Sequence, residues 1–264
     1  MKKINKIDWF TTYLQKKGFW VGGNIIIDFI SNETITETIR FFKGENEKYL
    51  VVYILEFDNK KKSSLDYKNI IKPIVNKLSI HNEFTLIIWP KEEINKFAIY
   101  KNEEFIANLN THNVLSFFSE FDESLVGKSS YIKRINKGYT DFFHKWAREY
   151  LKGFQNDIDS FLNLNNTLHM LELKRPQELV TTWRPYKADA NNYYEFKLFC
   201  DEKNYQLTNI AYSQRQKWKI KVFKNVTQTH RGLNYTQSTL EISPMDDLIQ
   251  LVNSSSFNEE YSTR

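Results

Sequence analysis

A short stretch of the chain, Asn156–Pro176, concentrates acidic side chains and one lysine within two runs of strand-forming residues. The Asn165-Asn166 pair in its middle predicts a tight hairpin turn, because asparagine tolerates the positive φ that such turns require. Counting outward from this turn places Asp159 opposite Glu172, with their Cβ atoms about 5 Å apart. Two opposed carboxylates repel each other, so the hairpin predicts a bound positive charge beside them.

A divalent cation is the simplest source of that charge. Side chains alternate along a strand, so Asp157 shares the face of Asp159, and Lys174 shares the face of Glu172. Hard carboxylate oxygens without a nearby thiolate or paired histidine favour Mg²⁺, for which Mn²⁺ can substitute. We expect Asp159 and Glu172, with Asp157, to hold the metal. Lys174 is placed to hold an anionic oxygen or an attacking water, and this combination suits hydrolysis of phosphodiester bonds.

The order of Asp159, Glu172, Leu173 and Lys174 resembles the signature of the PD-(D/E)XK, or restriction-endonuclease-like, nuclease superfamily. The resemblance implies Mg²⁺-dependent cleavage of nucleic acid, usually double-stranded DNA. By the same resemblance, Asp159 and Glu172 are metal ligands and Lys174 is the catalytic lysine. Asp157 and Asp159 remain alternatives for the main ligand, because only the hairpin count separates them. Many members act as dimers, since two strands must be cut, and a homodimer is therefore one expected assembly.

The superfamily core consists of a helix, three strands, a helix and a strand. An amphipathic helix expected at Tyr139–Phe154 matches the first helix of that core, and a helix expected at Tyr186–Lys203 matches the second. Glu149 falls where many members carry an additional acidic residue on the first helix. The fold class expected is therefore α/β, with a restriction-endonuclease-like mixed sheet in the C-terminal half.

The Asp/Glu-x-Lys tripeptide also occurs elsewhere, at Asp58–Lys60, Asp66–Lys68, Glu195–Lys197 and Asp201–Lys203. The last three lie in expected helices and are interpreted as solvated helix faces. Asp58–Lys60 follows a strong strand and is an alternative site. We favour the tripeptide at Glu172, because Asp58 lies beyond its apolar run and a basic loop follows at once.

Basic residues are unevenly distributed along the chain. The net charge is +5, and residues 131–240 hold 18 Lys and Arg against 10 Asp and Glu. Such a balance favours a polyanionic partner, because each phosphate contact releases counterions. The strand expected at Trp218–Phe223 presents lysines on one face, typical either of a phosphate-tracking surface or of a protected edge strand. The candidate nucleic-acid contacts are Arg175, Arg184, Lys187, Arg215, Lys217, Lys219 and Lys221.

Two parts are expected along the chain: residues 1–130 as an accessory α+β module for recognition or assembly, and residues 131–264 as the nuclease domain. The boundary is placed in the polar, mixed segment Asn108–Ser130. The further elements expected are helices at Lys6–Lys17, Asp66–Leu78 and Met245–Val252, and strands at Asn24–Ile30, Thr34–Phe42, Tyr49–Phe57, Phe84–Trp89, Lys96–Tyr100, Asp157–Leu162, Thr167–Leu173, Leu207–Ala211 and Ser238–Ile242.

Composition narrows the class of protein further. With 41% hydrophobic residues the chain can bury a core, and its single cysteine, Cys200, excludes an internal disulfide. The longest apolar run, Tyr49–Leu55, is too short for a membrane helix, and no secretory signal is visible. We therefore expect a cytoplasmic protein with no membrane partner. The function expected is a restriction or phage-defence endonuclease; the alternative is a non-catalytic nucleic-acid-binding or assembly protein with a degenerate nuclease core.

Overall fold

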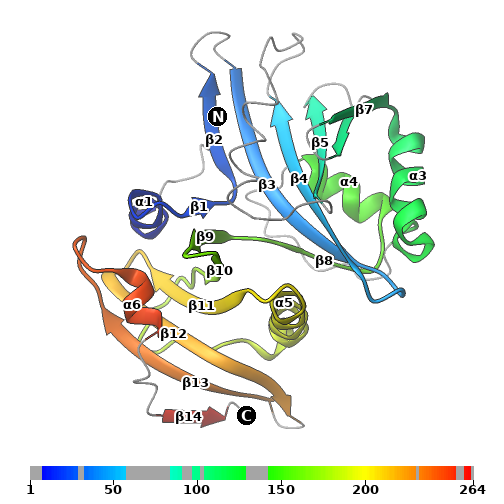
Figure 1. Cartoon of the computed structure of the whole chain (residues 1–264). Coiled ribbons are helices and arrows are strands. Elements are labelled where there is room, and N and C mark those ends of the chain that lie inside the picture. Colours follow the sequence, from blue (N-terminus) through cyan, green and yellow to red (C-terminus); the bar gives the residue numbers. More distant parts are fainter. Residues whose placement is uncertain are drawn as a thin grey trace. The chain divides into compact units, whose positions relative to one another are not determined.

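The computed structural model describes residues 8–28, 33–57, 84–90, 97–101, 104–128, 142–229, 232–253 and 259–262. The chain divides into two units, with unit 2 inserted in the sequence of unit 1 (Figure 1). Unit 1 consists of Met1–Val21 and Ile158–Arg264, and unit 2 is Gly22–Asp157. This division differs from the expected boundary near residue 130. The N-terminal helix belongs with the C-terminal part of the chain, and the helix expected at Tyr139–Phe154 belongs to unit 2.

Unit 1 contains a mixed sheet with the strand order β1-β9-β10-β11-β12-β13-β14. Its strands are β1 (Trp20–Val21), β9 (Ser160–Leu164), β10 (Thr167–Lys174), β11 (Gln206–Ser213), β12 (Gln216–Thr229), β13 (Gly232–Glu241) and β14 (Glu259–Ser262). β10 and β11 are parallel, and the other described pairs are antiparallel. A parallel pair needs a crossover connection, which is provided here by η2 (Lys187–Asp189) and α5 (Ala190–Glu202).

Helices cover both faces of this sheet. On one face, α1 (Trp9–Lys16) and α6 (Leu248–Asn253) pack on apolar side chains of β10, β11 and β12, including Leu171, Ile210 and Val222. On the other face, α5 packs through Tyr193 against Phe223 of β12. Because side chains alternate along β10, Glu172 and Lys174 lie on the α5 face, opposite Leu171.

The β9–β10 hairpin has the predicted register. Leu164 pairs with Thr167, and the ladder continues to the pair formed by Ser160 and Leu171. Asn165 and Asn166 form the turn with φ of 51° and 62°. The expected two-residue Asn-Asn turn is therefore confirmed, and Asp159 and Glu172 lie one position beyond the last pair of the ladder.

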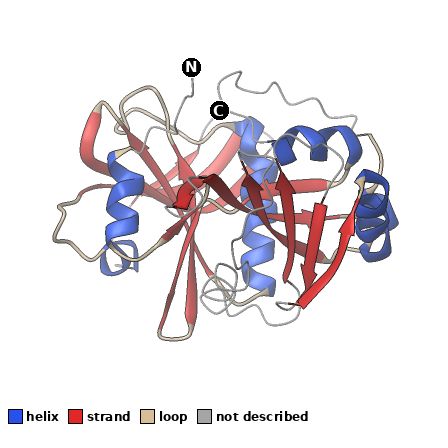
Figure 2. Cartoon of the chain, turned by 90° about the horizontal axis from the view of Figure 1, so that it is seen from above, coloured by secondary structure: helices blue, strands red, loops and turns tan. Residues whose placement is uncertain are grey.

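Unit 2 contains a second mixed sheet with the strand order β2-β3-β4-β5-β6-β7, and β8 also pairs with β3. Its strands are β2 (Asn24–Asp28), β3 (Glu33–Lys43), β4 (Tyr49–Phe57), β5 (Phe84–Pro90), β6 (Phe97–Lys101), β7 (Glu104–Leu109) and β8 (Phe154–Asp157). Its described helical elements are α3 (Thr111–Phe121), η1 (Glu123–Leu125) and α4 (Phe142–Tyr150). Strands make up most of the described regular structure in both units (Figure 2).

The core of unit 2 explains why α4 belongs to it. Phe143 and Trp146 of α4 are buried with Phe42 of β3, Val52 of β4 and Phe118 of α3. α3 occupies the segment that the sequence suggested as a polar boundary, because Val114 and Phe118 give it a buried face. The expected helix at Asp66–Leu78 lies outside the described residues. In the described parts of the chain, no helix has the length and apolar character needed to cross a bilayer.

Candidate functional site

The centre of the candidate site is an ion pair at the C-terminal end of β10. Lys174 Nζ lies 2.8 Å from Glu172 Oε1, and both side chains project from the same face of the strand. Glu172 is buried, with 4% of its surface exposed. A buried carboxylate of this kind needs a hydrogen-bonded counter-charge, and the Lys174 ammonium provides it.

Two residues complete the surroundings of Lys174: Asp189, in the connection between β10 and α5, and Tyr193, on α5. Asp189 Oδ2 lies 3.8 Å from Lys174 Nζ, and the ammonium also lies 5.2 Å from the centre of the Tyr193 ring. Burial alone would lower the pKa of Lys174, but the negative charges of Glu172 and Asp189 raise it above its usual value. Among the described residues, the buried Tyr193 hydroxyl has no hydrogen-bond partner, and burial raises its pKa.

Asp159 meets the same end of β10 through the backbone. It directly precedes β9, and its Oδ2 accepts a hydrogen bond of 2.7 Å from the N–H of Leu173. Leu173 stands between Glu172 and Lys174, so the Asp159 carboxylate is fixed against the segment that carries both of these side chains. The sequence predicted that these three residues would come together, and the structure describes them around one strand end.

Asp157 is placed differently from the prediction. It is the last residue of β8, pairs with Arg40 of β3, and forms an ion pair with Arg40 Nε at 2.6 Å. The expected strand from Asp157 to Leu162 is therefore wrong, because the chain leaves one sheet after Asp157 and enters the other at Ser160. Asp157 belongs to unit 2 and pairs there with the buried Arg40, so the structure lends no support to its expected role as a metal ligand.

Glu149 is also placed differently from the prediction. It lies on α4 in unit 2, where it is exposed, because α4 packs through Phe143 and Trp146 on the sheet of that unit. In unit 1, the helix that precedes the strands in the sequence is α1. The alternative tripeptide Asp58–Lys60 lies outside the described residues.

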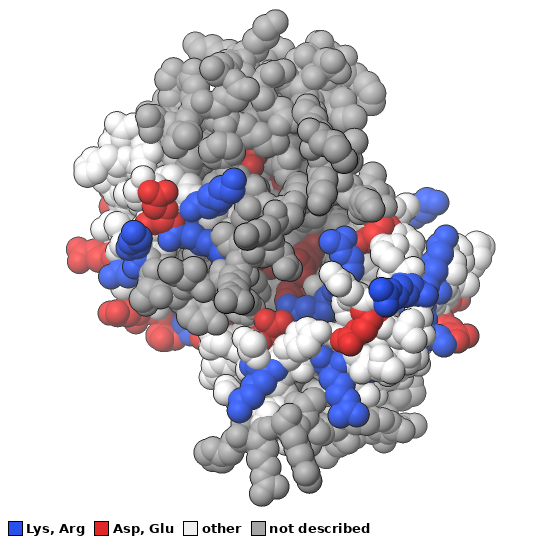
Figure 3. Space-filling view, turned by 180° about the vertical axis from the view of Figure 1, so that it is seen from behind, with Lys and Arg blue, Asp and Glu red and all other residues white. Residues whose placement is uncertain are grey.

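The candidate nucleic-acid contacts fall into two groups. Five are exposed to solvent: Arg175, Arg184, Lys187, Arg215 and Lys217. On the face of the molecule in Figure 3, Lys and Arg side chains are interspersed with Asp and Glu.

The other two candidate contacts, Lys219 and Lys221, are engaged within the protein. Lys219 Nζ lies 2.7 Å from Glu241 Oε1 of β13. Lys221 is buried, and its Nζ donates to the carbonyl oxygens of Thr181 and Trp183 at 3.3 and 2.6 Å. Burial lowers the pKa of Lys221. At Lys221 neither predicted role of the lysine face holds. The strand is not a protected edge, because β12 is internal, and Lys221 is not part of a phosphate-tracking surface, because it faces the covered side of the sheet.

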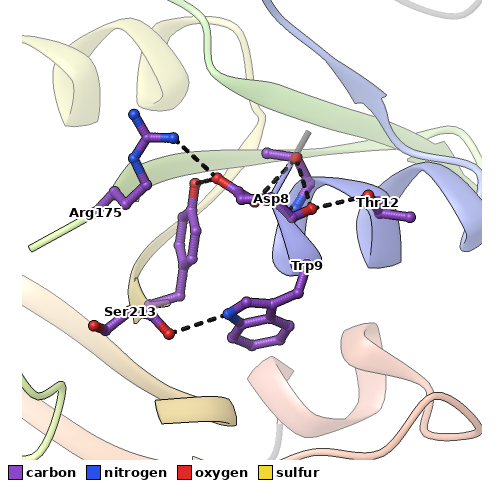
Figure 4. Close-up of polar contacts among 7 residues, drawn as sticks. Asp8, Trp9, Thr12, Arg175 and Ser213 are labelled. Atoms are coloured by element: carbon purple, nitrogen blue, oxygen red, sulfur yellow. Dashed lines mark hydrogen bonds and ion pairs between the residues drawn. The ribbon is translucent and has the colours of Figure 1, made fainter. Parts of the chain in front are cut away.

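Sequence reasoning missed one polar network beside the site. Asp8, the N-cap of α1, accepts hydrogen bonds from the Tyr212 hydroxyl of β11 and from Arg175, the residue after Lys174 (Figure 4). The signal that could have revealed the cap is an aspartate directly before the apolar periodic residues of a helix. No local pattern joins Asp8 to Tyr212, which lies 204 positions further along the chain.

The donor chemistry of Asp159 and Glu172 fits Mg²⁺. Within the described residues no group of three or more Asp, Glu, His and Cys side chains could hold a metal ion. Mg²⁺, however, usually keeps several waters and binds through one or two carboxylates together with phosphate oxygens of a substrate. Comparison of the chain with family models and with curated proteins gives no match.

Proposed function

We propose that this chain is a Mg²⁺-dependent endonuclease that hydrolyses phosphodiester bonds of DNA. The observation that carries the proposal is the hydrogen bond from the Leu173 N–H to Asp159, which brings a second carboxylate to the strand end that presents Glu172 and Lys174. Two carboxylates and an ammonium at one place are groups that metal-assisted phosphodiester hydrolysis can use.

The order of elements in unit 1 supports the same proposal. α1, β1, β9, β10, α5 and β11 follow each other as a helix, three strands, a helix and a strand, with unit 2 inserted after β1. The four strands are neighbours in the sheet, in the order β1-β9-β10-β11. This is the element order that the resemblance to the restriction-endonuclease-like superfamily implies, with α1 in place of the helix first expected at Tyr139–Phe154.

The residues of the site divide the work between them. Asp159 and Glu172 would hold Mg²⁺, which, when bound, lowers the pKa of its water and offsets the negative charge that develops on the phosphate. The Lys174 ammonium, which lies beside Glu172 and Asp189, would leave Glu172 Oε1 to the metal and donate a hydrogen bond to a phosphate oxygen or to the attacking water. The hydrogen bond to Leu173 N–H would keep the Asp159 carboxylate in one orientation.

The exposed basic residues support a polyanionic substrate. Arg175, Arg184 and Lys187 belong to the segment from the end of β10 to η2, close in sequence to Lys174 and Asp189. Cations at exposed positions beside a hydrolytic site would fix the DNA backbone without reading its sequence. By resemblance, a nuclease of this kind belongs to restriction or phage defence and acts as a homodimer when both strands are cut.

One observation favours a second candidate, a non-catalytic DNA-binding protein. The Lys174 ammonium is bonded directly to Glu172 Oε1 and so occupies an oxygen that a metal ligand would offer to the ion. If that ion pair does not open, the site binds phosphate without cutting it. Binding with no cleavage distinguishes this candidate from the endonuclease.

The test is cleavage of supercoiled plasmid DNA with and without Mg²⁺. Wild-type protein is expected to nick or linearise the plasmid, and Glu172→Gln and Lys174→Ala are expected to abolish the reaction. The matched control is Lys197→Ala, because Glu195–Lys197 carries the same tripeptide on α5, where Lys197 is exposed and pairs with Asp201. Cleavage that survives both site substitutions would overturn the assignment of these residues.

A further inference from the structure

The carboxylate of Asp8 is buried and binds four groups. Its Oδ1 accepts from the N–H and the hydroxyl of Thr11 at 2.8 and 2.9 Å, which caps α1. Its Oδ2 accepts from the Tyr212 hydroxyl at 2.6 Å and from Arg175 Nη1 at 3.2 Å (Figure 4). Only 4% of the Asp8 surface is exposed. Three of these hydrogen bonds satisfy the carboxylate without any contribution from the arginine.

Arg175 itself is held at one end and exposed at the other. Its side chain is 57% exposed, although Nη1 contacts a carboxylate that is almost fully buried. A guanidinium carries five N–H donors in a rigid planar fork, so a contact through Nη1 leaves donors for a second partner. An arginine whose orientation is fixed by a buried carboxylate loses less side-chain freedom when it binds an anion.

The network lies beside the candidate site. Arg175 directly follows Lys174, and Tyr212 belongs to β11, the parallel neighbour of β10. The pKa of Tyr212 is raised, mainly by burial and next by the charge of Asp8. The charge of Asp159 adds to this shift. Asp159 therefore lies close enough to act electrostatically on the tyrosine that shares Asp8 with Arg175.

We infer that Asp8 is a positioning residue that holds the Arg175 guanidinium so that its exposed donors bind a phosphate oxygen of the DNA backbone. The inference rests on the proposed function in its choice of substrate, and it assigns the DNA contact next to Lys174 to Arg175. Asp8 does not touch the DNA. It acts through the arginine, because a guanidinium fixed at Nη1 presents its remaining N–H groups in one direction.

The test is a double-mutant cycle in DNA binding, measured by fluorescence anisotropy with a short labelled duplex in EDTA. Asp8→Asn is chosen because asparagine caps a helix as well as aspartate does, whereas it loses the charge that orients the arginine. The matched control is Thr11→Ala, which removes a hydroxyl from Oδ1 and leaves the contacts of Oδ2 intact. Circular dichroism and thermal melting identify variants that fail to fold.

Arg175→Ala is expected to weaken binding about tenfold, and to reduce the slope of log K against log salt by about 0.9, the value of one phosphate contact. Asp8→Asn is expected to weaken binding about two- to fivefold in wild type and not at all in the Arg175→Ala background. Thr11→Ala is expected to bind as wild type does.

Three outcomes would overturn the inference: absence of duplex binding by wild type, wild-type affinity of Arg175→Ala, or an equal loss from Asp8→Asn in both backgrounds. If Asp8→Asn does not fold, Arg175→Lys decides. Lysine keeps the charge, but it lacks the planar set of N–H donors that lets arginine bind Asp8 and a phosphate together. Wild-type affinity of Arg175→Lys would therefore also overturn the inference. Cleavage with Mg²⁺ is measured separately. Its absence overturns the proposed nuclease and leaves the binding cycle valid.

Discussion

Replacement of Lys174 by methionine isolates the energetic role of the buried ion pair. Methionine keeps an apolar side chain of similar length but removes the ammonium that contacts Glu172 at 2.8 Å. Removing one partner of a buried pair costs about 3–5 kcal/mol. The Lys174 side chain is 20% exposed, so we expect the lower end of this range, about 3 kcal/mol. That loss is a large part of a typical stability of about 5–15 kcal/mol.

The loss is expected to depend on pH. Lys174→Met lacks the ammonium whose pKa is raised beside Glu172, so it also lacks the pH dependence that this group gives to stability. In wild type, the raised pKa of Lys174 gives a contribution that is fully present below the unfolded lysine pKa of about 10.4. The difference in stability between the two proteins should therefore stay constant from about pH 6 to about pH 9 and narrow only as the pH rises above about 10.4.

Urea unfolding followed by tryptophan fluorescence measures this difference, and Trp183 in the core of unit 1 reports on it. The double variant Glu172→Gln with Lys174→Met is the control, because it removes both charges and should recover most of the lost stability. Lys174→Met with wild-type stability at about pH 8 would refute the reasoning.

Three further predictions follow from individual contacts. Lys221→Met should lower stability by about 1–3 kcal/mol, because the carbonyl oxygens of Thr181 and Trp183 lose their donor. It should leave DNA affinity unchanged, whereas Lys217→Ala should lower affinity only; equilibrium unfolding and anisotropy separate the two. Asn166→Ala should cost about 1–2 kcal/mol in thermal or urea unfolding, because the residue has φ of 62°, and Asn166→Gly should cost much less. Asp157→Asn should lower stability by weakening its ion pair with Arg40 and should leave plasmid cleavage intact, which would be contradicted by a loss of cleavage in a folded variant.

Local signals predicted the hairpin because they act over a few residues. Asn165-Asn166 determines the turn, and the alternation of side chains then determines which residues of β9 and β10 pair. Asp159 and Glu172 could therefore be placed near each other from the sequence. Lys174 follows from Glu172 by the same alternation.

Non-local pairing could not be predicted in this way. β1 joins the sheet through the pair of Trp20 with Phe161. In the sequence, the whole of unit 2 lies between these two residues. The sequence around Asp157 also gives no sign that the chain changes sheets within two residues. Lys221 looked like a surface residue because its neighbours alternate, and only the segment that covers β12 makes it a buried donor.

The most direct test of the central claim is a crystal structure of the protein with Mn²⁺ and bound DNA. The account predicts anomalous density for Mn²⁺ about 2 Å from carboxylate oxygens of both Asp159 and Glu172, with a phosphate oxygen completing the coordination. A structure in which Mn²⁺ binds the DNA phosphate away from Asp159 and Glu172, with Lys174 still paired to Glu172, would contradict it.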